Sequence, residues 1–132
     1  MSLLRRALSL GAVLLAASSV ALLIAPGWLT EHLLDQSETP GDVWLRLLGA
    51  SGFSLALVHV LIVRKLDDLW WWTWSIVVFD LLVAVITVLQ PLAGLPDGSA
   101  AWPWWVAAGV SATLAGLCVA GLARAGQERP FA

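Results

Sequence analysis

One stretch of the sequence, residues 69–90, reads LWWWTWSIVVFDLLVAVITVLQ and carries a single ionisable side chain, Asp80. An α-helix needs about 20 mainly apolar residues to cross a hydrocarbon core of about 30 Å, because each residue advances the helix by about 1.5 Å. Residues 69–90 meet this requirement, and Pro91 follows where the helix is expected to end. The stretch is therefore predicted to be a transmembrane helix.

Three further segments have a similar length and apolar character; Pro26 and Gly27 follow the first of them, and Pro40 precedes the second. They are residues 7–25, 43–63 and 102–123. The sequence therefore predicts an all-α integral membrane protein with a single domain over residues 1–132, an antiparallel up-down-up-down bundle of four transmembrane helices. Because Arg5 and Arg6 precede the first segment, it also resembles a signal peptide, but no clean small-x-small cleavage site follows. We expect it to remain as an anchor.

The composition agrees with a membrane protein and argues against several other classes. Hydrophobic residues make up 60% of the chain and charged residues 12%, whereas soluble domains carry about 25% charged residues. A formal net charge of −2 with scattered basic residues does not favour nucleic-acid binding. The single cysteine, Cys118, excludes an internal disulfide and a thiolate metal cage. No metal and no cofactor are predicted.

The basic residues predict the orientation of the helices, because Lys and Arg concentrate in cytoplasmic loops. With four spans, all but Arg46 fall on one side of the membrane. These residues are Arg5, Arg6, Arg64, Lys65, Arg124 and Arg129. We therefore expect both termini in the cytoplasm. The Ala- and Leu-rich, Lys-poor composition is typical of a bacterium with GC-rich DNA, so the expected location is the bacterial plasma (inner) membrane.

Tryptophan side chains prefer the headgroup interface, where the ring is half buried and its N–H finds a partner. The tryptophans of this chain fall at the ends of the predicted spans, in an inner and an outer group. The inner group is Trp70, Trp71, Trp72 and Trp74, and the outer group is Trp28, Trp44, Trp102, Trp104 and Trp105. We interpret both groups as interface anchors. A stacking platform for a flat ligand is the alternative for the inner group, although consecutive helical residues point in different directions.

The loop after the first span is predicted to form a short amphipathic helix on the outer membrane surface, at about residues 29–37. Its leucines share one face and its charged residues share the opposite face. Thr30 is a candidate N-cap. His32 lies on the polar face, which favours a surface histidine over a metal ligand.

Apart from Arg46, near the outer end of the second span, two ionisable residues fall inside the predicted spans, His59 and Asp80. Such residues are costly in a membrane and are therefore functional candidates. Matching depths across the short connection between the second and third spans puts Asp80 near the midplane and His59 nearer the cytoplasm, so we expect no direct hydrogen bond between them. Hydroxyl side chains at the depth of Asp80 predict a central polar layer. Its members are Ser18, Ser19, Ser51, Ser54, Ser111 and Thr113.

Along the third span, Thr73, Asp80 and Thr87 recur every seven residues, so they share one helical face that is expected to point inward. With only hydroxyls as partners, a desolvated Asp80 is expected to be protonated and neutral. One interpretation is a carboxyl that ties helices together through a hydrogen bond. The other is an acid that exchanges protons or binds a ligand.

Small residues predict two stripes at which helices pack closely. The stripe of the second span is Gly49, Gly52 and Ala56, and that of the fourth span is Gly109, Ala112 and Gly116. His59 continues the first stripe and is expected to hydrogen-bond a neighbouring helix. Haem ligation is the alternative. The spans hold no second histidine, so a haem would need a ligand from another chain.

Two short motifs stand at the end of the first span and the start of the second. They are Ala25-Pro-Gly-Trp-Leu29 and Leu45-Arg-Leu-Leu-Gly-Ala50. With the polar loop between them, they resemble poorly characterised bacterial four-helix membrane proteins of the DoxX-like kind. The resemblance covers most of the chain in layout. It implies a membrane location and no known catalytic residues.

Two functional hypotheses follow. The first is a non-enzymatic accessory or scaffolding subunit, which packs through its small-residue stripes against a second copy or a larger membrane complex. The second is binding or transport of a small hydrophobic molecule, such as a lipid or a quinone, or of protons, at the polar layer around Asp80. An enzymatic role with Asp80 as an acid comes third. A cavity beside Asp80 would favour binding, whereas a fully packed layer would favour structure.

Overall fold

The structure is a computed structural model that describes residues 1–37 and 41–128. Within these ranges every regular element is helical. The long helices are α1 (Ser2–Ile24), α3 (Asp42–Arg64), α5 (Thr73–Ala93) and α6 (Trp102–Glu128). The short ones are α2 (Pro26–Trp28), the π-helical turn η1 (Leu29–Leu33), α4 (Leu66–Leu69) and the 3-10 turn η2 (Trp70–Trp72).

The four predicted membrane helices are present in the described residues. With α4, η2 and α5 taken as one segment, each is long and apolar enough to cross a membrane. Pro91 lies inside α5, so the prediction that Pro91 ends this helix is wrong. A proline in the last turn removes only one hydrogen bond near the helix end. The chain leaves the helix at Gly94. Its φ of 106° is a positive value that glycine adopts readily because it has no Cβ.

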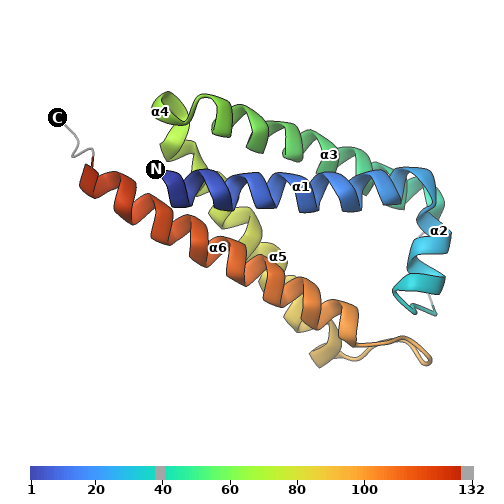
Figure 1. Ribbon diagram of the computed structural model, residues 1–132. Helices are drawn as coiled ribbons and strands as arrows, with labels where there is room; N and C mark the ends of the chain where they lie inside the picture. Colours follow the sequence, from blue (N-terminus) through green and yellow to red (C-terminus); the bar gives the residue numbers. More distant parts are fainter. Residues whose placement is uncertain (38–40, 129–132) are drawn as a thin grey trace.

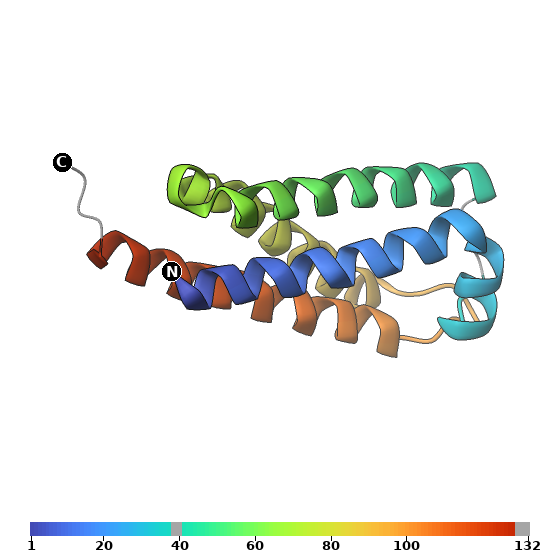
Figure 2. The same ribbon diagram turned by 45° about the horizontal axis from the view of Figure 1, so that its top comes forward.

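The long helices form two pairs. α1 packs along α3, α5 packs along α6, and contact between α1 and α6 joins the pairs. Successive long helices run in opposite directions (Figure 1). Figures 1 and 2 show the pairs close together at the end that carries α4 and apart at the end that carries α2.

The packed core lies at the α4 end. It combines the start of α1, the end of α3, the start of α5 and the end of α6. Its side chains include Leu4, Leu8, Ile62, Ile76, Val77, Cys118 and Leu122. Gly121 brings α6 against α1, because a Cβ built on this glycine would lie only 2.9 Å from the Cα of Leu4. The missing side chain allows this close approach.

Small residues of α3 face α1. A Cβ on Gly49 would lie 2.9 Å from the carbonyl oxygen of Ser19, and a Cβ on Gly52 would overlap the Oγ of Ser19. Ala56 is buried farther along α3. The close packing of α1 on α3 therefore depends on these glycines.

The turn after α1 differs from the prediction. A helical turn already begins at Pro26, which suits the first helical position because its N–H would lack an intrahelical partner. Thr30 is not an N-cap: it is buried, and its hydroxyl donates to the carbonyls of Pro26 at 3.0 Å and Gly27 at 3.1 Å. The helical turns end at Leu33, before residue 37. His32 is exposed, and its ring stacks on Trp28 with centroids 6.0 Å apart.

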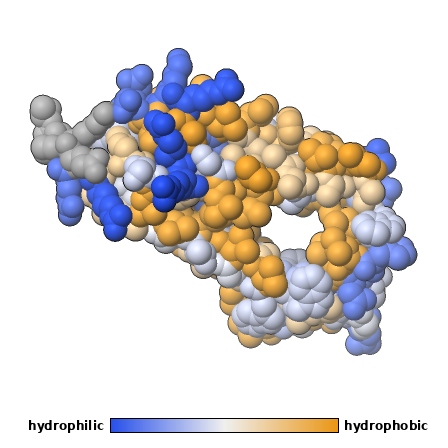
Figure 3. Space-filling model, in the orientation of Figure 1, coloured by the Kyte–Doolittle hydropathy of each residue, from blue (hydrophilic) through white to orange (hydrophobic). Residues whose placement is uncertain are grey.

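Most of the apolar surface of the helices faces outward. Figure 3 shows hydrophobic surface between two hydrophilic ends. Ile24, Leu48 and Leu92 are each at least 60% exposed. Soluble monomers rarely expose apolar patches of this extent. Together with the lengths of the four helices, this surface is that of a multi-pass membrane protein.

The basic and tryptophan residues mark the two ends of the bundle. The described members of the basic group lie near the α4 end, whereas Arg46 lies near the start of α3. Those members are Arg5, Arg6, Arg64, Lys65 and Arg124; Arg129 lies outside the described residues. The inner tryptophan group spans η2 and the start of α5, and the outer group lies in α2 and at the starts of α3 and α6.

Candidate ligand site between the helix pairs

A cavity of about 520 Å³ lies between the two helix pairs. Its walls are mainly apolar and include Leu15 of α1, Val83 of α5, and Val110 and Leu114 of α6. This volume falls within the range of about 300–1,000 Å³ that is usual for small-molecule sites. Figure 3 shows an opening between the pairs in the space-filling view. The bundle is therefore packed at the α4 end and hollow toward the α2 end.

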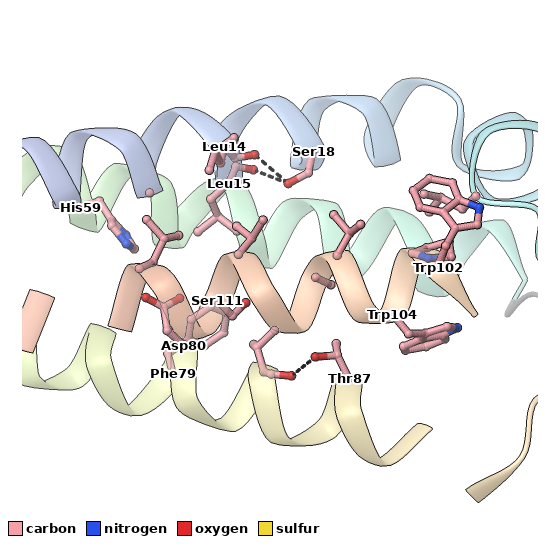
Figure 4. A pocket seen from close by; sticks show the side chains of 18 of the residues that line it. Leu14, Leu15, Ser18, His59, Phe79, Asp80, Thr87, Trp102, Trp104 and Ser111 are labelled. Carbon is pink, nitrogen blue, oxygen red and sulfur yellow. Dashed lines mark hydrogen bonds between the residues drawn. The ribbon is translucent and has the colours of Figure 1, made fainter. Parts of the chain in front are cut away.

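Polar side chains from three helices line the inner end of this cavity, next to the packed core. They are His59 of α3, Asp80 of α5 and Ser111 of α6. Figure 4 shows Asp80 beside Ser111, with His59 at the same end of the site. His59 is 3% exposed and Asp80 is 7% exposed. Both side chains are therefore almost completely removed from the surface.

One nitrogen of His59 is engaged within its own helix. Nδ1 lies 2.9 Å from the carbonyl oxygen of Leu55. Because a carbonyl accepts, Nδ1 carries the proton, and Nε2 of the neutral ring is an acceptor. A Cβ on Gly11 of α1 would lie 3.3 Å from Nε2. Gly11 thus makes room for the edge of the imidazole that faces the cavity.

Asp80 makes no hydrogen bond and no ion pair in the part of the chain that the structure describes. The hydroxyl of Ser111 likewise has no hydrogen-bond partner among those residues. His59 and Asp80 are not bonded to each other. A buried carboxyl without a cation beside it is most stable as the neutral acid, because burial penalises the charged form. The inner end therefore presents a buried carboxyl, a hydroxyl and an imidazole acceptor.

The outer end of the cavity is closed by hydrogen bonds between two loops. Gln36 donates from Nε2 to the carbonyl of Ala100 at 2.9 Å, and Trp104 donates from Nε1 to Oε1 of Gln36 at 3.1 Å. The N–H of Ala100 donates to the carbonyl of Asp35 at 2.8 Å. Both Gln36 and Trp104 line the cavity. One glutamine thus ties the segment after η1 to the start of α6.

Replacing Gln36 with Ala is expected to loosen this closure. The two side-chain hydrogen bonds of Gln36 that join the segments are lost, each of which contributes about 1 kcal/mol. The amide of Ala100 should then exchange its hydrogen about tenfold faster or more, as measured by hydrogen–deuterium exchange. Gln90→Ala is the control, because Gln90 is exposed and outside the cavity lining. Equal exchange at Ala100 in both variants would show that Gln36 does not hold the loops together.

The predicted polar layer is corrected by the structure. Ser51, Ser54 and Thr113 do not gather around Asp80; all three are exposed. Their hydroxyls donate to the carbonyls four residues earlier in the same helix, at 2.9, 3.0 and 2.7 Å. A hydroxyl that bonds to its own helix needs no partner from another helix. Its depth in the membrane therefore does not show whether the side chain points into the bundle. Of the predicted layer, Ser18 and Ser111 line the cavity with Asp80, whereas Ser19 is buried against Gly52 of α3.

The predicted inward stripe of α5 is confirmed. Thr73, Asp80 and Thr87 are all buried. They nevertheless lie in different surroundings: Asp80 and Thr87 line the cavity, whereas Thr73 does not. The hydroxyl of Thr73 is buried without a hydrogen-bond partner in the described residues.

The small-residue stripe predicted on α6 faces away from the other described helices. Gly109, Ala112 and Gly116 are exposed, and a Cβ on either glycine would meet nothing within 4 Å. A different face of α6 is buried, formed by Ala108, Ser111, Ala115, Cys118, Leu122 and Ala125. Small residues occur on several faces of this helix, so spacing alone did not identify the packed one. Gly11 and Gly121 were missed because they lie among other small or apolar residues.

The fold and the cavity define a class: an all-helical, multi-pass membrane protein with a site between two helix pairs. Comparison with protein-family models, with curated proteins and with solved structures finds no match. No group of three or more His, Cys, Asp or Glu side chains able to hold a metal ion occurs in residues 1–37 and 41–128.

Proposed function

We propose that the protein binds a small lipophilic molecule in the cavity between its helix pairs. One observation carries this proposal: an apolar cavity of about 520 Å³ contains buried polar side chains that have unused hydrogen-bonding groups. Burying such groups without partners costs free energy, and membrane proteins keep them chiefly at functional sites. A bound molecule would both fill the apolar space and supply the missing partners.

The position of the cavity favours binding over transport. The core around Leu4, Ile76 and Leu122 closes the α4 end, and all three side chains are buried. A site that is hollow on one side and packed on the other provides no continuous path across the bundle. The proposal is therefore a pocket that receives its ligand from one half of the membrane.

The orientation of the protein follows from its charges. We propose that the α4 end and both termini face the cytoplasm of a bacterium, because the described basic residues other than Arg46 gather there. The resemblance of two motifs to DoxX-like proteins supports the same plasma-membrane location. With this orientation, the cavity lies toward the outer leaflet.

The direct test is native mass spectrometry of the protein taken from its own membrane in polymer nanodiscs, without detergent. We expect one small molecule to be retained per chain after the bulk lipids have dissociated. Its mass and fragmentation would identify the ligand. Retention of bulk phospholipids only, in the proportions of the surrounding membrane, would contradict the proposal.

A second candidate function is that of an accessory or scaffolding subunit. The observation in its favour is the exposed stripe of Gly109, Ala112 and Gly116 on α6; a Cβ on either glycine would meet nothing within 4 Å in the described part of the chain. Small residues on a lipid-facing surface let another helix approach closely, whether from a second copy or from a larger complex.

Ala112→Leu tests the subunit hypothesis. A larger side chain at the centre of the stripe should prevent close helix packing and reduce chemical cross-linking between subunits in membranes about fivefold or more. Ala50→Leu on α3 is the matched control, because Ala50 is also exposed but lies on a different helix. Unchanged cross-linking in Ala112→Leu, or no cross-linking in the unmodified protein, would argue against this function.

A further inference from the structure

The inner end of the cavity offers a defined set of hydrogen-bonding groups. Nε2 of His59 is an acceptor, because Nδ1 carries the proton that is donated to Leu55. In its protonated form the carboxyl of Asp80 offers a donor and an acceptor, and the hydroxyl of Ser111 offers both. A polar group of a ligand that forms hydrogen bonds with all of these side chains must donate to the imidazole and accept from the carboxyl.

We infer that the ligand carries a hydroxyl group, as an alcohol or a phenol, and that this hydroxyl binds between His59, Asp80 and Ser111. The inference rests on the proposed function and names its ligand class. A hydroxyl both donates and accepts, so it satisfies the two kinds of group at once. Ketones, quinones and ethers only accept, and they would leave the buried Nε2 of His59 without a donor.

An ammonium head fits the site less well. It would require an ionised Asp80, and a buried carboxylate that has no ion pair and no hydrogen bond in the described chain is costly before the ligand arrives. The hydroxyl needs no charge on either side. The observations therefore favour an uncharged, hydroxyl-bearing lipophile.

The shape of the cavity orients this molecule. Polar groups lie at the inner end, apolar side chains line the middle, and Trp102 and Trp104 lie at the outer end. From Ser111 to Trp102 the cavity follows nine residues of α6, or about 14 Å at about 1.5 Å per residue. The hydroxyl would point toward the membrane midplane, and the apolar body would extend toward the outer interface.

The test compares farnesol with its methyl ether, in which a methyl group replaces the hydroxyl hydrogen. Binding of each to the full chain in lipid nanodiscs is measured by native mass spectrometry at equal mole fractions in the membrane. We expect farnesol to bind about tenfold more tightly, which corresponds to one hydrogen bond to a buried acceptor. The ether should still bind, because the apolar walls are unchanged.

Variants identify the groups that recognise the hydroxyl. His59→Phe should weaken farnesol binding about tenfold and leave ether binding unchanged. This variant should therefore no longer prefer farnesol over its methyl ether. Asp80→Asn should keep farnesol binding within about threefold, because an amide also donates and accepts, whereas Asp80→Leu should weaken it about tenfold. Ser111→Ala should weaken farnesol binding by up to about tenfold. Thr113→Val is its control, since Thr113 lies outside this cavity on the same helix.

A spectroscopic measurement requires no change at the site. With ¹⁵N-histidine labelling and His32→Gln to simplify the spectrum, the Nε2 resonance of His59 should shift when farnesol is added and not when the ether is added. Equal binding of alcohol and ether, or an unmoved Nε2 resonance, would overturn the hydroxyl inference while the binding function stands. Loss of farnesol binding in Asp80→Asn would also overturn it, in favour of a charged carboxylate. Binding of neither probe would count against the proposed function itself, and against this inference with it.

Discussion

Gly121→Ala is expected to lower the free energy of unfolding by about 1–3 kcal/mol, the usual cost of overpacking a tight contact. The new Cβ would lie 2.9 Å from both the Cα and the Cβ of Leu4. Leu4 is fully buried, and its Cα belongs to the backbone of α1, so neither atom has room to withdraw. This contact joins the two helix pairs, and denaturant unfolding in micelles followed by tryptophan fluorescence measures its loss.

Gly126→Ala is the matched control for this effect. It lies in the same helix, and a Cβ there would meet nothing within 4 Å. Alanine is the better helix former by about 1 kcal/mol, so this variant should be as stable as the parent or more stable. If both alanines had the same effect, the approach of α6 to α1 would not depend on Gly121.

Ala107→Trp is expected to weaken the binding of farnesol by at least about a hundredfold, equivalent to about 2.8 kcal/mol. Ala107 lines the cavity on α6, one helical turn from Ser111. An indole at this position would occupy the space that the apolar body of the ligand requires. The measurement is the same mass-spectrometric titration in nanodiscs.

Ala120→Trp controls for the introduction of a large aromatic residue into α6. Ala120 is exposed on this helix and lies outside the cavity. Farnesol should bind this variant as it binds the parent chain, within about twofold, a difference of less than about 0.5 kcal/mol. Undiminished binding in Ala107→Trp would place the probe elsewhere, for example in the surrounding lipid.

The third span shows how far the sequence determines a site. Thr73, Asp80 and Thr87 recur every seven residues, and few polar residues lie on the other faces of this helix. The inward direction of Asp80 was therefore predictable. The hydroxyl residues of the other spans were less informative. Ser51, Ser54 and Thr113 bond to their own helices, and a side chain with that option carries no information about its neighbours.

The fourth span shows the opposite case. Gly109 and Gly121 have the same size and the same kind of spacing to other small residues, yet one is exposed and the other contacts Leu4. In a lipid-facing helix the outward face is also apolar or small, so hydropathy does not separate inside from outside. Only the placement of α1 against α6 distinguishes them.

The sequence by itself determined that the chain is helical, that it has four apolar segments able to cross a membrane, and that Asp80 is buried. Each of these depends on the length or periodicity of a single segment, which local physics decides. The cavity was decided only by the tertiary structure. It exists because Gly121 and Leu4 hold the helix pairs together at one end while the pairs separate at the other. The angle between the pairs therefore depends on contacts between residues more than a hundred positions apart.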